Sequence, residues 1–98
     1  MLQFTAKSSG LKSADAVICD RSCRLLSVQV IADGTNAATA ILYDNASAAS
    51  GTVVSKIIVD ATLTFESFQS TCGIECSNGL YLDVTGTGCE VVVHYALL

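Results

Sequence analysis

The feature that most constrains the fold is an alternation of side chains with a period of two along Cys23–Ala32 and again along Ala37–Tyr43. In the first run, one face of an extended chain carries Leu26, Val28, Val30 and Ala32, and the other carries Leu25, Ser27, Gln29 and Ile31. This period predicts β-strands that are half-buried against a core. Asp33–Asn36 contains residues that tolerate a positive φ, so we expect it to form a hairpin turn between two neighbouring strands.

Further strand-like runs follow at roughly regular spacing. We expect strands at Asp15–Cys19, Thr52–Asp60, Leu63–Gln69, Leu80–Thr85 and Cys89–Leu98. Loops are expected at Asp44–Gly51 and Ser70–Gly79, and a tight hairpin turn at Gly86–Gly88. No run has a helical period of useful length, and the chain has no proline. The pattern predicts an all-β fold: an antiparallel, jelly-roll-like β-sandwich of seven to eight short strands, with a small β-barrel as the alternative.

The length of 98 residues predicts one domain over residues 1–98. Near its start, Leu2, Phe4 and Ala6 alternate, which fits a short first strand. Residues 1–14 fit equally well as an N-terminal arm that docks on a neighbour, because termini are often ordered only by contacts.

The composition favours association between subunits. Hydrophobic residues make up 51% of the chain and charged residues 14%. So few charges cannot cover a small domain, and apolar surface leaves water when subunits associate. Both faces of Thr52–Asp60 are partly apolar, which indicates a strand that is covered on both sides or lies at a subunit interface. We therefore expect a homo-oligomer.

The charge pattern argues against a nucleic-acid partner. The net charge is −4, and the five basic residues form no continuous stripe of the kind that tracks phosphates. The apolar runs are of strand length, well short of the ~20 residues that cross a bilayer, so no membrane partner is expected. Met1–Gly10 lacks the layout of a secretory signal, and we expect synthesis in a cytoplasm.

Five cysteines cannot all pair within one chain, and they are Cys19, Cys23, Cys72, Cys76 and Cys89. Free, buried thiols are the first expectation in a cytoplasmic product. A disulfide is the second: Cys72 and Cys76 could bridge across their loop, or Cys19 and Cys23 could meet partners on neighbouring strands. Zinc is not expected: residues four apart in a strand lie about 13 Å apart, too far to share an ion.

Catalytic and cofactor-binding patterns are not found. His94 is the only histidine, and no nucleophile-elbow motif accompanies it, so a solvated or interface histidine is expected. The nine carboxylates are scattered singly at turns and outward strand positions, which is usual for solubility and turn formation. We expect no enzyme activity, no catalytic or metal-binding residues and no cofactor.

Three stretches carry a resemblance to a known family. Tyr43–Thr52 reads YDNASAASGT, Asn78–Gly88 reads NGLYLDVTGTG, and Val91–Tyr95 reads VVVHY. With this layout, Leu25–Tyr95 resembles small virion structural proteins of tailed bacteriophages. The shared motifs are turns and strands, so the resemblance carries over no active site.

The resemblance implies a capsid decoration (cement) protein: a homo-oligomer, of trimeric type, that is bound to the major capsid protein at the capsid surface. Small residues allow close backbone approach, and we expect oligomer or capsid contacts at Asn45, Ala46, Ser47, Ala48 and Ser50, together with Val54 and Ile58. The alternatives are a neck, tail or fibre component, and a glycan-binding module on the virion surface. The aromatic platform of such a module would be Tyr43, Tyr81 and Tyr95.

Overall fold

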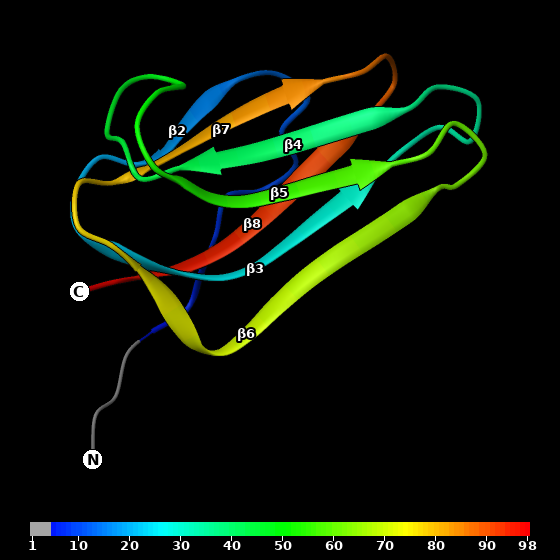
Figure 1. Cartoon of the computed structure of the whole chain (residues 1–98). Helices are drawn as coiled ribbons and strands as arrows, with labels where there is room; N and C mark the ends of the chain where they lie inside the picture. Colours follow the sequence, from blue (N-terminus) through cyan, green and yellow to red (C-terminus); the bar gives the residue numbers. More distant parts are fainter. Residues whose placement is uncertain (1–4) are drawn as a thin grey trace.

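The computed structural model describes residues 5–98, and at Thr71 the backbone alone. Its eight strands are β1 (Lys7–Ser8), β2 (Ala16–Cys19), β3 (Cys23–Ile31), β4 (Ala38–Tyr43), β5 (Val53–Val59), β6 (Phe65–Cys76), β7 (Leu80–Thr85) and β8 (Glu90–Leu97) (Figure 1). No helix that could span a membrane occurs in the described part of the chain.

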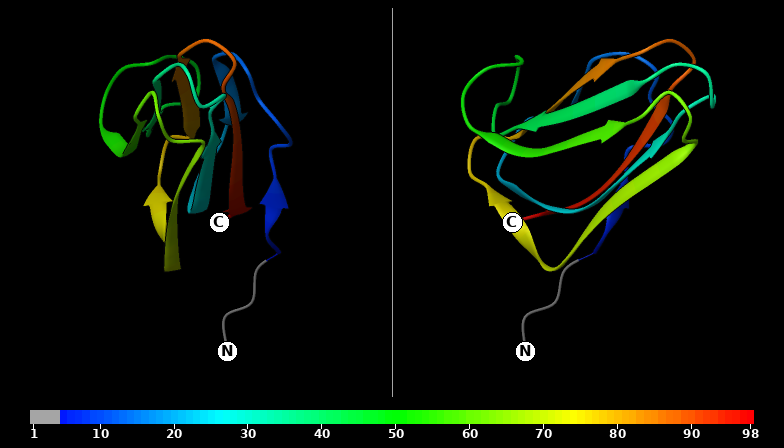
Figure 2. Two further views of the ribbon diagram at one scale, coloured as in Figure 1. Left: turned by 90° about the vertical axis from the view of Figure 1, so that its right-hand side faces the viewer. Right: turned by 45° about the vertical axis from the view of Figure 1, so that its right-hand side comes forward.

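The strands form two four-stranded antiparallel sheets that pack face to face (Figure 2). The first sheet has the order β1-β8-β3-β6 and the second has the order β2-β7-β4-β5. This interleaved order is that of a jelly roll. The structure thus confirms the predicted all-β sandwich of jelly-roll type.

Most connections cross from one sheet to the other. Asp33–Asn36 joins β3 in the first sheet to β4 in the second, and Gly86–Gly88 likewise joins β7 to β8. The prediction of hairpins at these two turns was therefore wrong. Turn residues specify a chain reversal, but the buried rows of β3 and β4 face one another across a shared core instead of pairing by hydrogen bonds. Among the described strands, only β4 and β5 are joined as a hairpin, through Asp44–Gly51.

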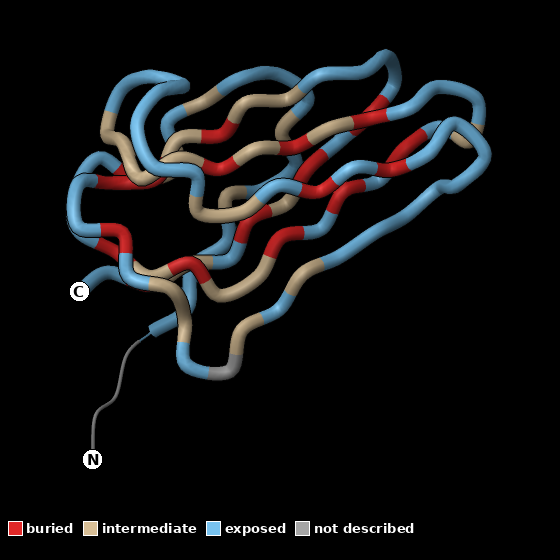
Figure 3. The backbone as a smooth tube through the Cα atoms, viewed as in Figure 1, coloured by how far each residue is buried: buried red, intermediate tan, exposed pale blue. Residues whose placement is uncertain are grey.

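The core lies between the sheets and is built from alternate residues of the inner strands (Figure 3). Its fully buried side chains include Leu25, Val28, Val30, Leu42, Val59, Leu80, Leu82, Val91 and Val93. In β8, Val91 and Val93 are buried, as are Cys89 just before the strand and Ala96 near its end, and Tyr95 is partly buried against the core.

A β-bulge in β3 changes which of its residues face the core. Leu25 pairs with Tyr95 of β8 and Ser27 pairs with His94, so Leu26 is an extra residue in β3. The buried set is Cys23 and Leu25 before the bulge, and Val28 and Val30 after it. The expectation that Leu26 shares a face with Val28 and Val30 was wrong, because one inserted residue exchanges the two faces.

Strand β6 is longer than predicted and is bent sharply opposite the same bulge (Figure 1). Gln69 pairs with Ser27 and Ile74 with Leu25, so Ser70–Gly73 is accommodated opposite Leu26 alone. The predicted loop over Ser70–Gly79 was wrong up to Cys76, since pairing with β3 resumes at Ile74.

The N-terminal segment joins its own sandwich. Lys7 and Ser8 pair with Tyr95 and His94 of β8, and Lys12 forms a bridge with Val91. Much of the predicted arm over residues 1–14 is therefore docked along β8, although Ser13 and Ala14 lie outside any strand. Of the strand predicted from Leu2, Phe4 and Ala6, the first two residues lie outside the described residues.

Candidate functional site

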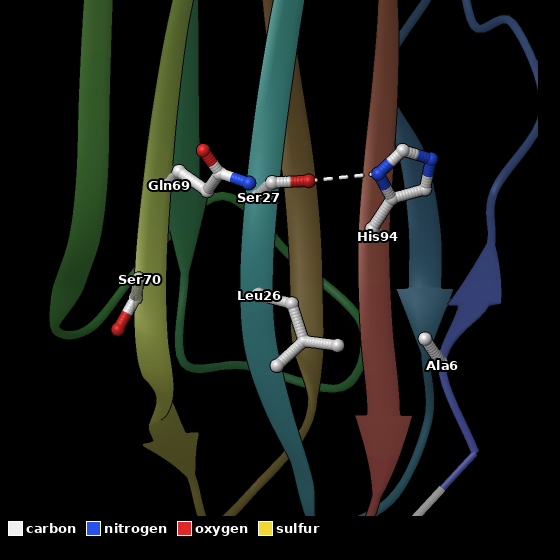
Figure 4. A pocket seen from close by; sticks show the side chains of 6 residues that line it. All are labelled: Ala6, Leu26, Ser27, Gln69, Ser70 and His94. Carbon is white, nitrogen blue, oxygen red and sulfur yellow. Dashed lines mark hydrogen bonds between the residues drawn. The ribbon is translucent and has the colours of Figure 1, made fainter.

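The bulge creates an open hollow of about 700 Å³ on the outer face of the first sheet (Figure 4). His94, Ser27 and Gln69 are paired positions on β8, β3 and β6, so they form one row across the sheet. Leu26 lies beside this row because the bulge turns it outward, and Ala6 and Ser70 complete the lining.

A hydrogen bond of 2.7 Å joins Ser27 Oγ and His94 Nδ1 in the hollow (Figure 4). A nucleophilic serine needs a base that a third group orients, together with donors for the oxyanion. The six described residues that line the hollow include no carboxylate to orient His94. The hollow offers hydroxyl, imidazole and amide groups over an apolar floor, and the absence of enzyme activity stays a prediction.

A second candidate surface is the outer face of the β2-β7-β4-β5 sheet. Val17, Tyr81, Tyr43 and Val53 are paired in succession across its four strands. They face outward because their neighbours Leu82 and Leu42 are buried in the core. We call this surface, with the adjacent row described next, the tyrosine face. Tyr95 lies in the other sheet against the core, so the expected platform of three tyrosines is not formed.

The adjacent row of the tyrosine face is charged at both ends. Asp83 of β7, Ile41 of β4 and Lys56 of β5 are paired in succession. Asp15 lies next to Asp83 and accepts a hydrogen bond of 2.8 Å from the Val84 N–H. Partial burial, and the charge of Asp15, raise the pKa of Asp83 above its ordinary value. Lys56 has no ion-pair partner among residues 5–98.

The Asp44–Gly51 loop, where contacts were expected, is held by its own polar groups. Asn45 Oδ1 accepts hydrogen bonds from the N–H groups of Ser47 and Ala48, and its amide donates to the Ser50 carbonyl. Asp44 accepts a hydrogen bond from the Asn78 N–H, which ties the loop to the turn before β7.

The predicted contact residues fall into two groups. Ser47, Ala48 and Ser50 are exposed on the loop, and Ile58 is 59% exposed on β5. Asn45 and Ala46 are partly buried, and Ala46 lies against Gly79 in the turn before β7. Val54 packs against the core, because a β-bulge after Val53 turns it inward. Its predicted place at an interface stays a prediction, as do those of the other contact residues.

The free edge of β6 is a third candidate surface. β6 is an edge strand that pairs with β3 alone in the described part of the chain. Phe65 is 50% exposed beside its partner Ile31, and Leu63 just before it is 47% exposed. We call β6 with these three side chains the β6 edge. An exposed strand edge with apolar neighbours is a template for pairing with another chain.

Three of the five thiols gather at one end of the sandwich. Cys23 and Cys76 are partners in β3 and β6, and Cys19 lies beside Cys23. A hydrogen bond to Cys76, together with burial, raises the pKa of Cys23, which keeps it protonated. None of the five cysteines forms a disulfide, and Cys72 is the one that is exposed. The expected bridge from Cys72 to Cys76 is absent, because Cys76 points toward Cys23 in the core.

No three His, Cys, Asp or Glu side chains within residues 5–98 are placed to hold a metal ion. Comparison of the chain with protein-family models, with curated proteins and with solved structures gives no match.

Sequence reasoning missed the hollow with Ser27 and Gln69, and also the β6 edge. One signal for the hollow was present. Leu25 and Leu26 are adjacent leucines in an otherwise alternating run, which is what an inserted bulge residue looks like. The β6 edge had no such signal, because strand order is a property of the tertiary fold.

Proposed function

We propose that this chain is a structural protein of a tailed-bacteriophage virion, which decorates the capsid as a homo-oligomer and stabilises it by binding the major capsid protein. The observation that carries this proposal is the β6 edge. A 12-residue strand has no strand beside its outer edge in the described chain, and Ile31, Leu63 and Phe65 leave apolar surface in water next to it. An edge of this kind binds an extended segment of another chain through backbone hydrogen bonds.

The fold and the motif resemblance support the same proposal. Jelly rolls include viral capsid domains and lectins, although a fold by itself assigns no function. The resemblance of Leu25–Tyr95 to small phage virion proteins favours the first of these. The trimeric state that the resemblance implies stays a prediction.

The proposal is tested with phage particles that lack the protein. We expect such heads to assemble but to release their genome at a lower temperature, and purified protein to restore the heat resistance. Heads that are equally robust without the protein would contradict the stabilising role. Purified virions that contain none of the chain by mass spectrometry would overturn the proposal altogether.

Paired variants test the β6 edge itself. Phe65→Asp places a charge on the edge, and Leu63→Asp does so outside any strand, where folding is less affected. Leu11→Asp is the matched control, since Leu11 is 59% exposed next to the β8 side of the same sheet. We expect the first two variants to lose at least ten-fold in bound copies per particle and the control to bind normally. Equal binding by all three would exclude the β6 edge.

A particle reconstruction separates this function from its alternatives. Density spread over the capsid surface supports decoration, whereas a ring at the portal end or density along the tail assigns the chain to the neck, tail or fibres.

A further inference from the structure

The tyrosine face has an internal symmetry across its strands. Its first row reads Val17, Tyr81, Tyr43, Val53 from β2 to β5, and it reads the same by residue type from β5 to β2. The adjacent row carries Asp15 and Asp83 at the β2 and β7 side and Lys56 at the β5 side.

A two-fold axis uses both patterns at once. Consider a second copy facing the first, with the axis between them, parallel to the strands and midway between β7 and β4. This operation places β7 over β4 of the second copy and β2 over β5. Each Tyr81 then meets a Tyr43, and each Val17 meets a Val53. The same operation brings Lys56 over Asp15 of the other copy, with Asp83 on the neighbouring strand, so opposite charges meet at both ends.

We propose that the tyrosine face binds a second copy of this chain in this two-fold arrangement. The contact is isologous, with the same residues contributed by each copy. Two sheets pack in this way with aligned strands and the side chains of both faces between them. The proposal deepens the homo-oligomer part of the proposed function by naming the face. A two-fold contact closes a dimer, and association into a trimer requires a different surface.

The chemistry of the face favours a second copy over other occupants. Val17 and Val53 are 45% and 50% exposed, and the contact removes both from water. Paired tyrosines gain from offset stacking at the centre of an interface. Lys56 is separated from Asp83 by Ile41 within one copy, so its carboxylate partners come from the other copy. A neutral carbohydrate would use the tyrosines and leave this charge pattern without a role.

The size of the face sets the expected affinity. Four strands spaced at about 4.8 Å, each about 20 Å long, give a face of roughly 400 Å² per copy. The total is therefore ~800 Å², which is the range of weak, transient interfaces. We expect a dissociation constant on the order of micromolar or weaker, which requires measurement over a wide concentration range.

The test is sedimentation equilibrium of the purified chain from 1 µM to 1 mM. We expect a monomer–dimer equilibrium for the natural sequence. Lys56→Glu and Asp15→Lys each place like charges against one another at both ends of the contact, and each variant alone should dimerise at least ten-fold more weakly. Mixed together, the two variants should form a heterodimer, because the new glutamate of the first variant then meets the new lysine of the second.

Lys7→Glu and Glu90→Lys are the matched controls, since both residues are exposed on strands of the other sheet and change the net charge equally. The sedimentation experiment depends on the tyrosine face, whereas the particle-binding assay depends on the β6 edge. Either proposal can therefore fail while the other holds. A monomer throughout, a dimer equally weakened by the control substitutions, or a mixture without heterodimer would overturn the proposal. A monomer in which oligosaccharides shift the Tyr43 and Tyr81 NMR signals would assign the face to carbohydrate instead.

Discussion

Gly79 lies where three segments of the chain meet, and Gly79→Ala provides a direct test of the packing there. A Cβ at this position would lie 2.7 Å from the carbonyl oxygen of Cys19 and 2.9 Å from the Cα of Ala46. Both contacts are with backbone atoms, so β2 or the Asp44–Gly51 loop would have to move. The φ of Gly79 is +146°, a conformation that residues with a Cβ rarely adopt.

Two costs add in this variant. The unfavourable backbone conformation contributes about 1–3 kcal/mol, and the forced displacement of packed neighbours contributes about 1–3 kcal/mol. We therefore expect the free energy of unfolding to fall by roughly 2–6 kcal/mol, a large part of the ~5–15 kcal/mol typical of a domain. The melting temperature should fall by about 4–8 °C for each kcal/mol.

Gly10→Ala is the matched control. Gly10 also has a positive φ, at +72°, but no atom lies within 4 Å of a Cβ built there. This variant carries the conformational cost alone, about 1 kcal/mol. Urea unfolding followed by circular dichroism gives both values. If Gly79→Ala is destabilised by no more than Gly10→Ala, the close packing of the three segments at Gly79 is refuted.

Other predictions concern the core, two carboxylates and the thiols. Leu82 is fully buried, and Leu82→Ala should lower the free energy of unfolding by about 2–5 kcal/mol, as measured by denaturant titration. Hydrogen bonds, of which the one from the Thr35 N–H contributes most, lower the pKa of Asp33 in the folded chain. The stabilisation by this carboxylate is therefore present above roughly pH 4 and is lost as the pH falls toward its folded-state pKa. In the Asp33→Ala variant, the free energy of unfolding should depend less on pH across the acid range. The pKa of Asp83 is raised in the folded chain, so its effect is opposite: the free energy of unfolding falls as the pH rises through this pKa. Asp15→Asn keeps an oxygen that accepts the hydrogen bond from the Val84 N–H but removes the charge beside Asp83. At concentrations where the chain is monomeric, this variant should gain more stability at pH 7 than at pH 4. An equal change in stability at the two pH values would exclude the interaction between the two carboxyl groups. A thiol reagent should modify only Cys72 in the folded chain and all five cysteines in denaturant.

The two proposals divide the surface of the sandwich between different partners. The β6 edge belongs to the first sheet and is assigned to the capsid, whereas the tyrosine face belongs to the second sheet and is assigned to another copy. A chain that uses both surfaces would link neighbouring capsid sites in pairs, which is a direct way for a small domain to stabilise a shell.

The strands themselves were predictable because their signal is local. Alternation along Val28–Ala32, Ala38–Tyr43 and Leu80–Thr85 reflects a period of two in side-chain direction, and these residues alternate in burial as expected. The loop at Asp44–Gly51 was predictable for the same reason, since its small and polar residues offer no apolar period.

Strand partners were not predictable, because they depend on contacts between residues far apart in the chain. Asp33–Asn36 has the composition of a hairpin turn, yet the strands on either side pair with β6, β8, β5 and β7. The Leu26 bulge shows the same limit at the scale of one residue. The adjacent leucines indicated an irregularity, but only the register with Tyr95 and His94 determined which leucine faces the core.

By itself, then, the sequence determined that this chain is a β-sandwich of short strands with more apolar surface than its charges can cover. The tertiary structure decided where that surface lies. In the folded chain, Tyr43 lies beside Tyr81, Tyr95 packs against the core, and β6 is an edge strand. The physical reason is that a strand is marked by the alternation of residues adjacent in the chain, whereas a surface is composed of residues that only the order of the strands brings together.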